Sequence, residues 1–355
     1  MADYNLTKSD QVEGEVNPDI DGHSEALTTT ATAVEEQPDL VAEGGVKRPG
    51  DRIFETLSTA SASLITVFIA AIGIFLIIRA VPALQNNVNG FGGFFTYSGD
   101  WNTSDVTAMK FGIPSLFAST VTMSIVALVI AMPIALGVAI FLANYCPQKL
   151  VKPLGFLVDM LAAVPSIVYG LWGWLVLGPL LSKFYEWLHS WAGGFFLFTT
   201  YSNSPSFGTA RNMFTGGIVL AVMILPIIAA TAREVFVQTP KGHIEAALAL
   251  GATRWEVVRM TVLPFGLSGY ISGSMLGLGR ALGETMALYM VVGPSTEFRW
   301  SLFDGGTTFA TAIARAAPEF NDPTRAGAYI AAGLVLFVLT FVVNAIARAI
   351  VASKK

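Results

Sequence analysis

The chain has 355 residues, of which 53% are hydrophobic and only 13% charged, and its mean hydropathy is +0.60. This composition is too apolar for a soluble domain of that length, so the sequence indicates a membrane protein. The formal net charge is −4, with much of the acidity near the N-terminus. The single cysteine, Cys146, excludes an intrachain disulfide and a CxxC motif, and the three scattered histidines exclude a clustered metal site.

The N-terminal segment, residues 1–46, is polar and acidic and shows no apolar periodicity. It cannot bury enough surface to offset its chain entropy, so we expect a disordered cytoplasmic tail. No basic region followed by an apolar stretch is present in it, and a signal peptide is therefore not expected.

Six apolar segments follow, and each is long enough to cross a bilayer as a helix. We predict an all-α polytopic membrane protein, with a transmembrane domain over residues 50–352. The predicted spans are residues 57–80, 114–142, 154–180, 213–232, 266–292 and 326–350.

The placement of Lys and Arg predicts that both termini are cytoplasmic, because the connecting segments on that side then hold more of these residues. Three long segments on the other side, 81–113, 181–212 and 293–325, are expected to form caps or partial helices. Their tryptophans are more typical of interfacial anchors than of ligand platforms; examples are Trp187, Trp191 and Trp300.

The cytoplasmic segment 233–265 is expected to form two short helices. Thr239 is predicted to cap the first helix, and Gly251 is predicted to end it in a left-handed conformation. Thr253 and Glu256 then form a Thr-x-x-Glu capping box at the start of the second helix. The helix pair is either a docking knob or simply a well-folded loop, and its periodicity alone leaves both interpretations open.

The sequence Glu245-Ala-Ala-Leu-Ala-Leu-Gly251, followed after nine residues by Thr261-Val-Leu-Pro264, resembles the EAA motif of ABC-importer permeases. The single departure is Thr261, where the motif has Ile. The resemblance implies that Glu245, Ala246, Ala247 and Gly251 couple this chain to a separate ATPase. No GxxxxGK[ST] phosphate-binding loop occurs in the sequence, so ATP and Mg²⁺ are expected on that partner and no cofactor on this chain.

The fifth predicted span contains two charged residues, Arg280 and Glu284, one helical turn apart on the same face. Charges within a membrane normally face a cavity or a partner. One interpretation is a structural ion pair; the other is a substrate site. A stripe of small residues, Gly269, Gly273, Gly277 and Ala281, places the pair beside a close helix contact and favours a site at a subunit seam.

The chemistry of the pair fits phosphate. A guanidinium matches phosphate oxygens, and a carboxylate can accept the P–OH proton that sulfate lacks at neutral pH. We therefore hypothesise that Arg280 and Glu284 select phosphate. Ser166, after the Pro165 break in the third span, is a further candidate because broken helices expose anion-binding termini, although such a proline is often only a kink.

Two further segments, Ala163-Val-Pro-Ser-Ile-Val-Tyr-Gly-Leu-Trp-Gly173 and Gly277-Leu-Gly-Arg-Ala-Leu-Gly-Glu-Thr-Met-Ala287, resemble PstC-type permeases of the phosphate ABC importer. The resemblance covers roughly residues 50 to 350. It implies the type I ABC-importer permease fold, also called MetI-like, in a bacterial cell membrane, and functional importance for Arg280 and Glu284.

By the same resemblance, the partners are a PstA-like second permease, two PstB-like ATPase subunits and a PstS-like phosphate-binding protein outside the membrane. Alternatives are the PstA-type sister subunit, a permease for sulfate or molybdate, and an ion-coupled carrier or channel. A membrane enzyme is not expected, because the sequence shows no catalytic or metal-binding constellation. Nucleic acid is not expected as a partner.

Overall fold

A computed structural model describes residues 49–88, 90–200, 207–295 and 300–352, and it is built from helices over these residues. The predicted acidic tail, residues 1–46, lies outside them. Contacts divide the chain into two units, Met1–Leu64 and Ile65–Lys355.

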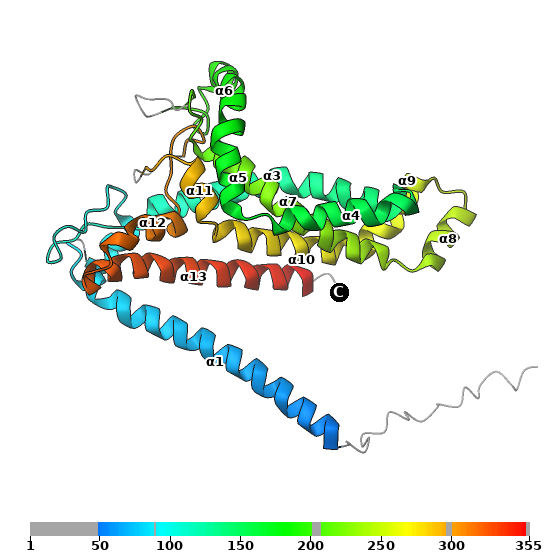
Figure 1. The fold of residues 1–355 in the computed structure, drawn as a ribbon, viewed down its shortest axis with the longest axis horizontal. Helices are drawn as coiled ribbons and strands as arrows, with labels where there is room; N and C mark the ends of the chain where they lie inside the picture. The colour runs from blue at the N-terminus through cyan, green and yellow to red at the C-terminus, as the bar shows by residue number, and fades with distance from the viewer. Residues whose placement is uncertain (1–48, 89, 201–206, 296–299, 353–355) are drawn as a thin grey trace, which may run out of the picture. The chain divides into compact units, whose positions relative to one another are not determined.

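Helix α1 begins in the first unit and continues into the second (Figure 1). Its described residues in the first unit are exposed, and in the second unit its burial begins only near its end, at Ala80, Ala83 and Leu84. Large apolar side chains such as Phe68 and Phe75 remain exposed. An apolar surface of this kind is typical of a helix that contacts lipid or another membrane subunit.

The described helices have the following bounds: α1 Pro49–Gln85, α2 Gly90–Thr96, α3 Pro114–Ile140, α4 Gln148–Ala163, α5 Ser166–Trp172, α6 Gly178–Ala192, α7 Met213–Val237, α8 Lys241–Ala249, α9 Arg254–Val257, α10 Leu263–Leu282, α11 Met286–Val291, α12 Phe309–Ala316 and α13 Pro323–Ala352. Wide π-helical turns extend α3 to Tyr145, join α5 to α6 through Gly173–Leu177 and join α9 to α10 through Val258–Val262.

In the second unit, α3, α4, α7 and α10 run side by side, with α8 and α9 at one end and α11 and α12 toward the other (Figure 1). Among all the described residues, five helical segments are long and apolar enough to cross a membrane: Pro49–Gln85, Pro114–Tyr145, Ser166–Ala192, Met213–Val237 and Pro323–Ala349. The predicted span over 266–292 is not among them, because glycines and serines lower the hydropathy of α10 and the helix stops at Leu282.

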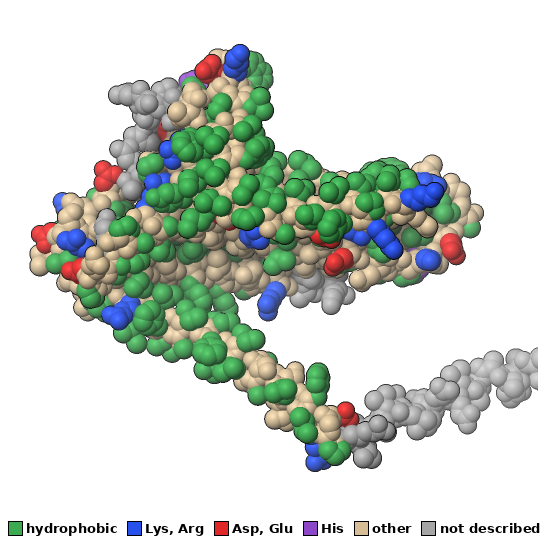
Figure 2. Space-filling view, in the orientation of Figure 1, with side chains coloured by type: hydrophobic (Ala, Val, Ile, Leu, Met, Phe, Trp, Pro, Cys, Tyr) green, Lys and Arg blue, Asp and Glu red, His purple; other side chains and the backbone are tan. Residues whose placement is uncertain are grey.

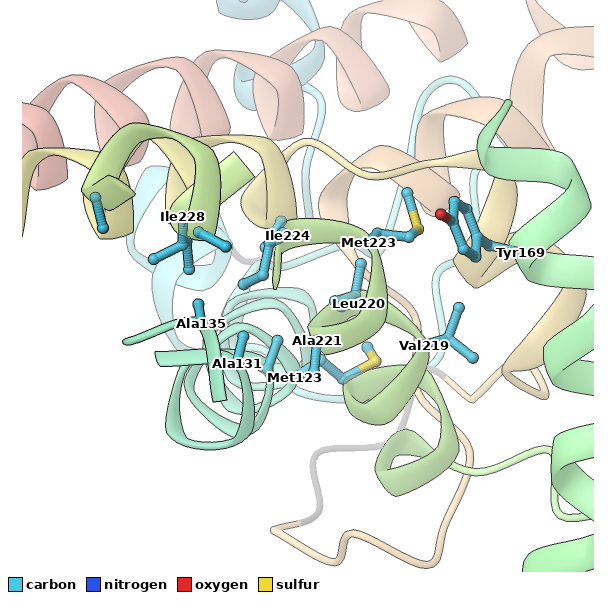
Figure 3. Packing of buried hydrophobic residues seen from close by; sticks show 14 of the residues in the cluster. Met123, Ala131, Ala135, Tyr169, Val219, Leu220, Ala221, Met223, Ile224 and Ile228 are labelled. Carbon is cyan, nitrogen blue, oxygen red and sulfur yellow. The ribbon is translucent and has the colours of Figure 1, made fainter. Parts of the chain in front are cut away.

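Helix α7 lies at the centre of the core. On one side it packs against α3, whose alanines at every fourth position, Ala127, Ala131, Ala135 and Ala139, are fully buried. Figure 3 shows Ala131 and Ala135 next to the larger α7 side chains, among them Ile224 and Ile228. Small residues on one helix thus let the two backbones approach closely.

On its other side α7 packs against α10, and here too the small residues belong to the partner helix. A Cβ atom added at Gly273 would overlap Thr231, and one at Gly269 would overlap Val235. The small-residue stripe of α10 therefore packs within this chain. The inference that it marks a seam between subunits was wrong, since α7 already occupies that face.

Candidate functional site

An open cavity of about 560 Å³ lies between α7, α10 and α13. It contains the charged residue Arg280 together with two polar residues of α13, in a part of the molecule where most side chains are apolar. Its lining residues are Ile227, Met275, Leu276, Gly279, Arg280, Thr340 and Asn344. We call this cavity the Arg280 groove.

Arg280 occupies the last turn of α10, and its side chain is exposed. The last carbonyls of a helix stabilise a positive charge at this position. Within the described residues, Arg280 makes no ion pair with a carboxylate. A guanidinium exposed in an apolar stretch is costly in a membrane unless a partner or water covers it, so we expect one of these to cover Arg280.

Glu284 is placed differently from Arg280. Its side chain is 8% exposed, and its Oε1 accepts a hydrogen bond from the backbone N–H of Ala287 at 3.0 Å. The carboxylate thereby satisfies a free donor at the start of α11, where negative charge is favoured. The break between α10 and α11 exists because the helix ends at Leu282 and this cap begins a new one.

The predicted shared helical face of Arg280 and Glu284 is therefore wrong, because the helix does not continue from one residue to the other. The ion pair that was the alternative interpretation is also absent between these two described residues.

Ser166 lies at the start of α5, a helix that packs against α11. It begins α5 after Pro165, which is the N-cap residue, and its side chain is half-buried; the preceding helix α4 ends at Ala163, where the extended backbone of Val164 follows. Gly170 of α5 lies against Ala287 and Met290, and Gly173, one turn further on, against Val291. Helices α5 and α11 thus run in the same direction side by side.

Thr340 and Asn344 of α13 complete the polar side of the Arg280 groove, and neither residue was predicted from the sequence. The Thr340 hydroxyl donates to the carbonyl of Phe337 at 2.9 Å, whereas the exposed Asn344 amide has no hydrogen bond to a described residue. A signal was present, because Asn344 is the one amide side chain in the apolar run 326–350. Polar residues in membrane helices commonly face a path or a partner helix.

Two of the three features predicted for the loop helices α8 and α9 are present in the structure. The capping box is confirmed: the Thr253 backbone N–H donates to Glu256 Oε2 at 2.7 Å, and the Glu256 N–H donates to the Thr253 hydroxyl at 3.4 Å. Gly251 has φ of +85°, which confirms the left-handed stop. The cap predicted at Thr239 is wrong, because Pro240 occupies the N-cap position and the Thr239 side chain makes no cap.

Hydrogen bonds from Thr253 hold the pKa of the Glu256 carboxyl below its usual value, the backbone N–H having the larger effect and the hydroxyl the next. The carboxylate is fully exposed, so the capping box is a local feature of the loop surface. It fixes where α9 begins and hence how α8 is presented.

Helix α8 has no buried residue. Glu245 and Ala246 are exposed, Ala247 is half-buried, and Leu250 just after the helix is 90% exposed. This end of the molecule mixes acidic and basic side chains, whereas the middle of the bundle is mostly hydrophobic (Figure 2). A small apolar surface surrounded by charges is the expected form of a protein docking site.

Comparison with known proteins identifies the family. Residues 135–355 match the model of the binding-protein-dependent transport system inner membrane component. The phosphate transport system permease protein PstC 2 of Mycobacterium tuberculosis is 53% identical over 308 residues, covering 86% of this chain and 93% of that protein. The PstC protein of Pasteurella multocida is 39% identical over 289 residues, covering 79% and 88%.

Two solved transporters share the fold. A bacterial alginate ABC transporter in complex with its periplasmic protein aligns with a TM-score of 0.54 at 16% identity, covering 84% of this chain and 93% of that one. The inward-facing MetNI methionine ABC transporter aligns with a TM-score of 0.50 at 18% identity, covering 68% and 95%. These alignments show the fold, and the sequence matches show that the chain belongs to the PstC family of phosphate transport system permease proteins, within the inner membrane components of ABC importers.

Proposed function

We propose that this chain is the permease subunit of an ATP-driven importer of inorganic phosphate and that the Arg280 groove lies on its substrate path. The observation that carries the site is an exposed guanidinium in an apolar helix bundle, without a carboxylate partner among the described residues and beside the Asn344 amide. The PstC relatives support phosphate as the substrate.

Several polar side chains of the groove can bind the phosphate together. Arg280 supplies charge and a fork of donors for two phosphate oxygens, and Asn344 and Thr340 add an amide and a hydroxyl. We propose that Glu284 and Ser166, at the starts of α11 and α5, accept a hydrogen bond from the P–OH group as the anion passes. A carboxylate beside the path disfavours sulfate, which has no such proton to donate.

The α8–α9 loop is proposed to transmit ATPase closure. Its residues Glu245, Ala246, Ala247 and Gly251 match the EAA motif, and within the described part of the chain no residue of α8 is buried. The motors would be two PstB-like subunits that hold ATP and Mg²⁺.

A PstA-like permease would cover the groove, and a PstS-like protein would deliver phosphate at the α12 end. The chain would lie in a bacterial cell membrane with both termini cytoplasmic, which puts α8 on the ATP side.

The test is uptake of radioactive phosphate by the complex reconstituted in vesicles, with and without ATP and with excess sulfate or molybdate. We expect uptake that requires ATP and the binding protein and that excess sulfate leaves nearly unchanged. Equal inhibition by sulfate or molybdate would point to a general oxyanion permease. Uptake without ATP would point to an ion-coupled carrier or channel.

A further inference from the structure

A second polar cavity, of about 200 Å³, lies at the end of the bundle opposite α8 and α9, between α3, α12 and α13. None of its lining residues is acidic, and one is an arginine. The lining residues are Trp101, Leu116, Pro294, Thr307, Ala312, Arg315, Ala316 and Tyr329. We call this cavity the Arg315 pocket. A water takes about 30 Å³ of liquid volume, so the pocket has room for a tetrahedral oxyanion and several waters.

Arg315, near the end of α12, is held in place by the end of another helix. Its Nη2 lies 3.4 Å from the carbonyl oxygens of both Tyr289 and Val292, in and just after the last turn of α11, and its guanidinium lies 4.4 Å from the centre of the Tyr289 ring. Its buried Nε has no hydrogen-bond partner. The charge is therefore fixed at the pocket with donor capacity to spare.

A second arginine adds to the positive charge. Arg211 lies over the Trp174 ring, its carbonyl accepts from the Gly293 N–H at 2.9 Å, and its buried Nε also has no partner. Burial lowers the pKa of Arg315; the Tyr289 side chain opposes this, and the Arg211 charge lowers it further. In the described part of the chain neither arginine makes an ion pair, and the charge of Arg211 acts on Arg315.

Thr307 supplies a hydroxyl to the same pocket. Its side chain is only 5% exposed, and its Oγ1 is buried without a hydrogen-bond partner. A buried hydroxyl without a partner is unfavourable, and a bound ligand would remove that penalty. The pocket thus combines a fixed cation, an unsatisfied hydroxyl and aromatic walls from Trp101 and Tyr329.

We propose that the Arg315 pocket binds inorganic phosphate, held by the Arg315 guanidinium and the Thr307 hydroxyl, at the end of the molecule opposite the α8–α9 loop. This inference rests on the proposed function, because it names a first binding position for the same substrate. Phosphate would occupy it before moving on to Arg280. The alternative is a purely structural role, in which Arg315 only caps α11. In that case phosphate would not protect a thiol in the pocket from labelling.

The test measures phosphate binding without transport. In the complete complex carrying C146S, Pro294→Cys introduces a thiol at an exposed position that lines the pocket, and Trp191→Cys introduces a control thiol on α6, which does not contribute to the pocket. We expect saturating phosphate to slow labelling of P294C by a charged thiol reagent by about tenfold, because an occupied pocket excludes it, and to leave W191C labelling unchanged.

Arg315→Gln should abolish this protection, Arg315→Lys should retain part of it, and T307V should raise the half-protecting phosphate concentration by about tenfold, as loss of a charge-assisted hydrogen bond does. R280Q should leave protection intact. A labelling rate without phosphate that equals that of the P294C parent shows that a variant is still folded. R315K, which retains the charge, provides a second check that lost protection means lost phosphate binding.

The proposal that the Arg315 pocket binds phosphate would be wrong if phosphate did not protect P294C. It would also be wrong if phosphate protected P294C equally well in the presence of R315Q. If the parent complex takes up phosphate in that case, only this inference fails. If it takes up none, the proposed function fails as well.

Discussion

Helices α8 and α10 both present small residues on one face, but the two faces have opposite environments. On α10, Gly266, Gly273 and Gly277 are buried against α7 of the same chain. On α8, Ala246 and Ala249 are exposed, and no residue of the helix is buried. The same kind of surface is thus satisfied within the chain in one case and left for a partner in the other.

Because of this difference, substitutions that lower the stability of the chain should be distinct from substitutions that weaken its coupling to a partner. A substitution on the buried face of α10 acts on the fold, because the neighbouring backbone cannot move away cheaply. A substitution on the exposed face of α8 acts on whatever docks there, because no residue of α8 is buried and its main contacts within the described chain are with α9 and the turn Val258–Val262. The predictions below test that separation.

The largest effect is expected from Gly273→Leu. A side chain here meets Thr231 and the carbonyl of Ile228 on α7, so the two helices must move apart at a cost of at least about 1–3 kcal/mol. We expect a lower midpoint of thermal unfolding in detergent and little assembled complex. The matched control is G137A on α3, where an added Cβ has no neighbour within 4 Å. Equal stability of the two variants would show that α10 does not pack as described.

Leu250→Asp should give the opposite pattern. Because Leu250 is 90% exposed, its replacement should leave unfolding of the isolated chain within about 0.5 kcal/mol of the parent. Phosphate uptake by the complex should fall by about tenfold or more if this side chain contacts the ATPase.

L250M, which keeps an apolar side chain, serves as the control for L250D. Full uptake by L250D would mean that this side chain is not part of a docking surface.

Glu284 allows capping and selectivity to be separated. E284A removes the acceptor for the Ala287 N–H and should destabilise α11 by about 1 kcal/mol. E284Q keeps an acceptor oxygen but removes the charge, so the start of α11 should survive. If the carboxylate selects phosphate, E284Q should let sulfate compete several-fold better. Unchanged competition in E284Q, together with a destabilised E284A, would leave Glu284 as a cap only.

The smallest effect is expected in the capping box. T253A should speed amide hydrogen exchange at Glu256 by a few-fold, because the N–H loses its acceptor. Since the pKa of Glu256 is lowered in the folded loop, its stabilising contribution is complete above the unfolded-state pKa and is lost as pH falls through the folded-state value. The difference between parent and T253A should therefore shrink at acid pH. A difference that does not change with pH would exclude this role for the carboxylate.

Features set by neighbouring residues could be predicted from the sequence. The Thr253 and Glu256 box and the left-handed Gly251 both depend on a few consecutive residues. The error at Thr239 is local too: Pro240, with its extended backbone, takes the cap position, and the preceding threonine is turned into the interior.

Features set by distant contacts could not be predicted. The break after Leu282 depends on a buried Glu284 and on α5 packing against α11, and nothing in the short sequence around Gly283 specifies that contact. The Arg280 groove needs Thr340 and Asn344, which lie some sixty residues further along the chain. The residue types that suit phosphate were visible in the sequence, but their grouping follows from how α10 packs between α7 and α13.

The central claim, that the Arg280 groove lies on the phosphate path, is tested most directly by R280Q in the reconstituted complex. Uptake and ATP hydrolysis are measured in the same vesicles, with Arg348→Gln as the control, because Arg348 is an exposed arginine of α13 that does not line the groove. We predict that R280Q loses nearly all phosphate uptake while the complex still assembles and hydrolyses ATP, and that R348Q behaves like the parent. Normal uptake by R280Q would contradict the account and place the substrate path elsewhere.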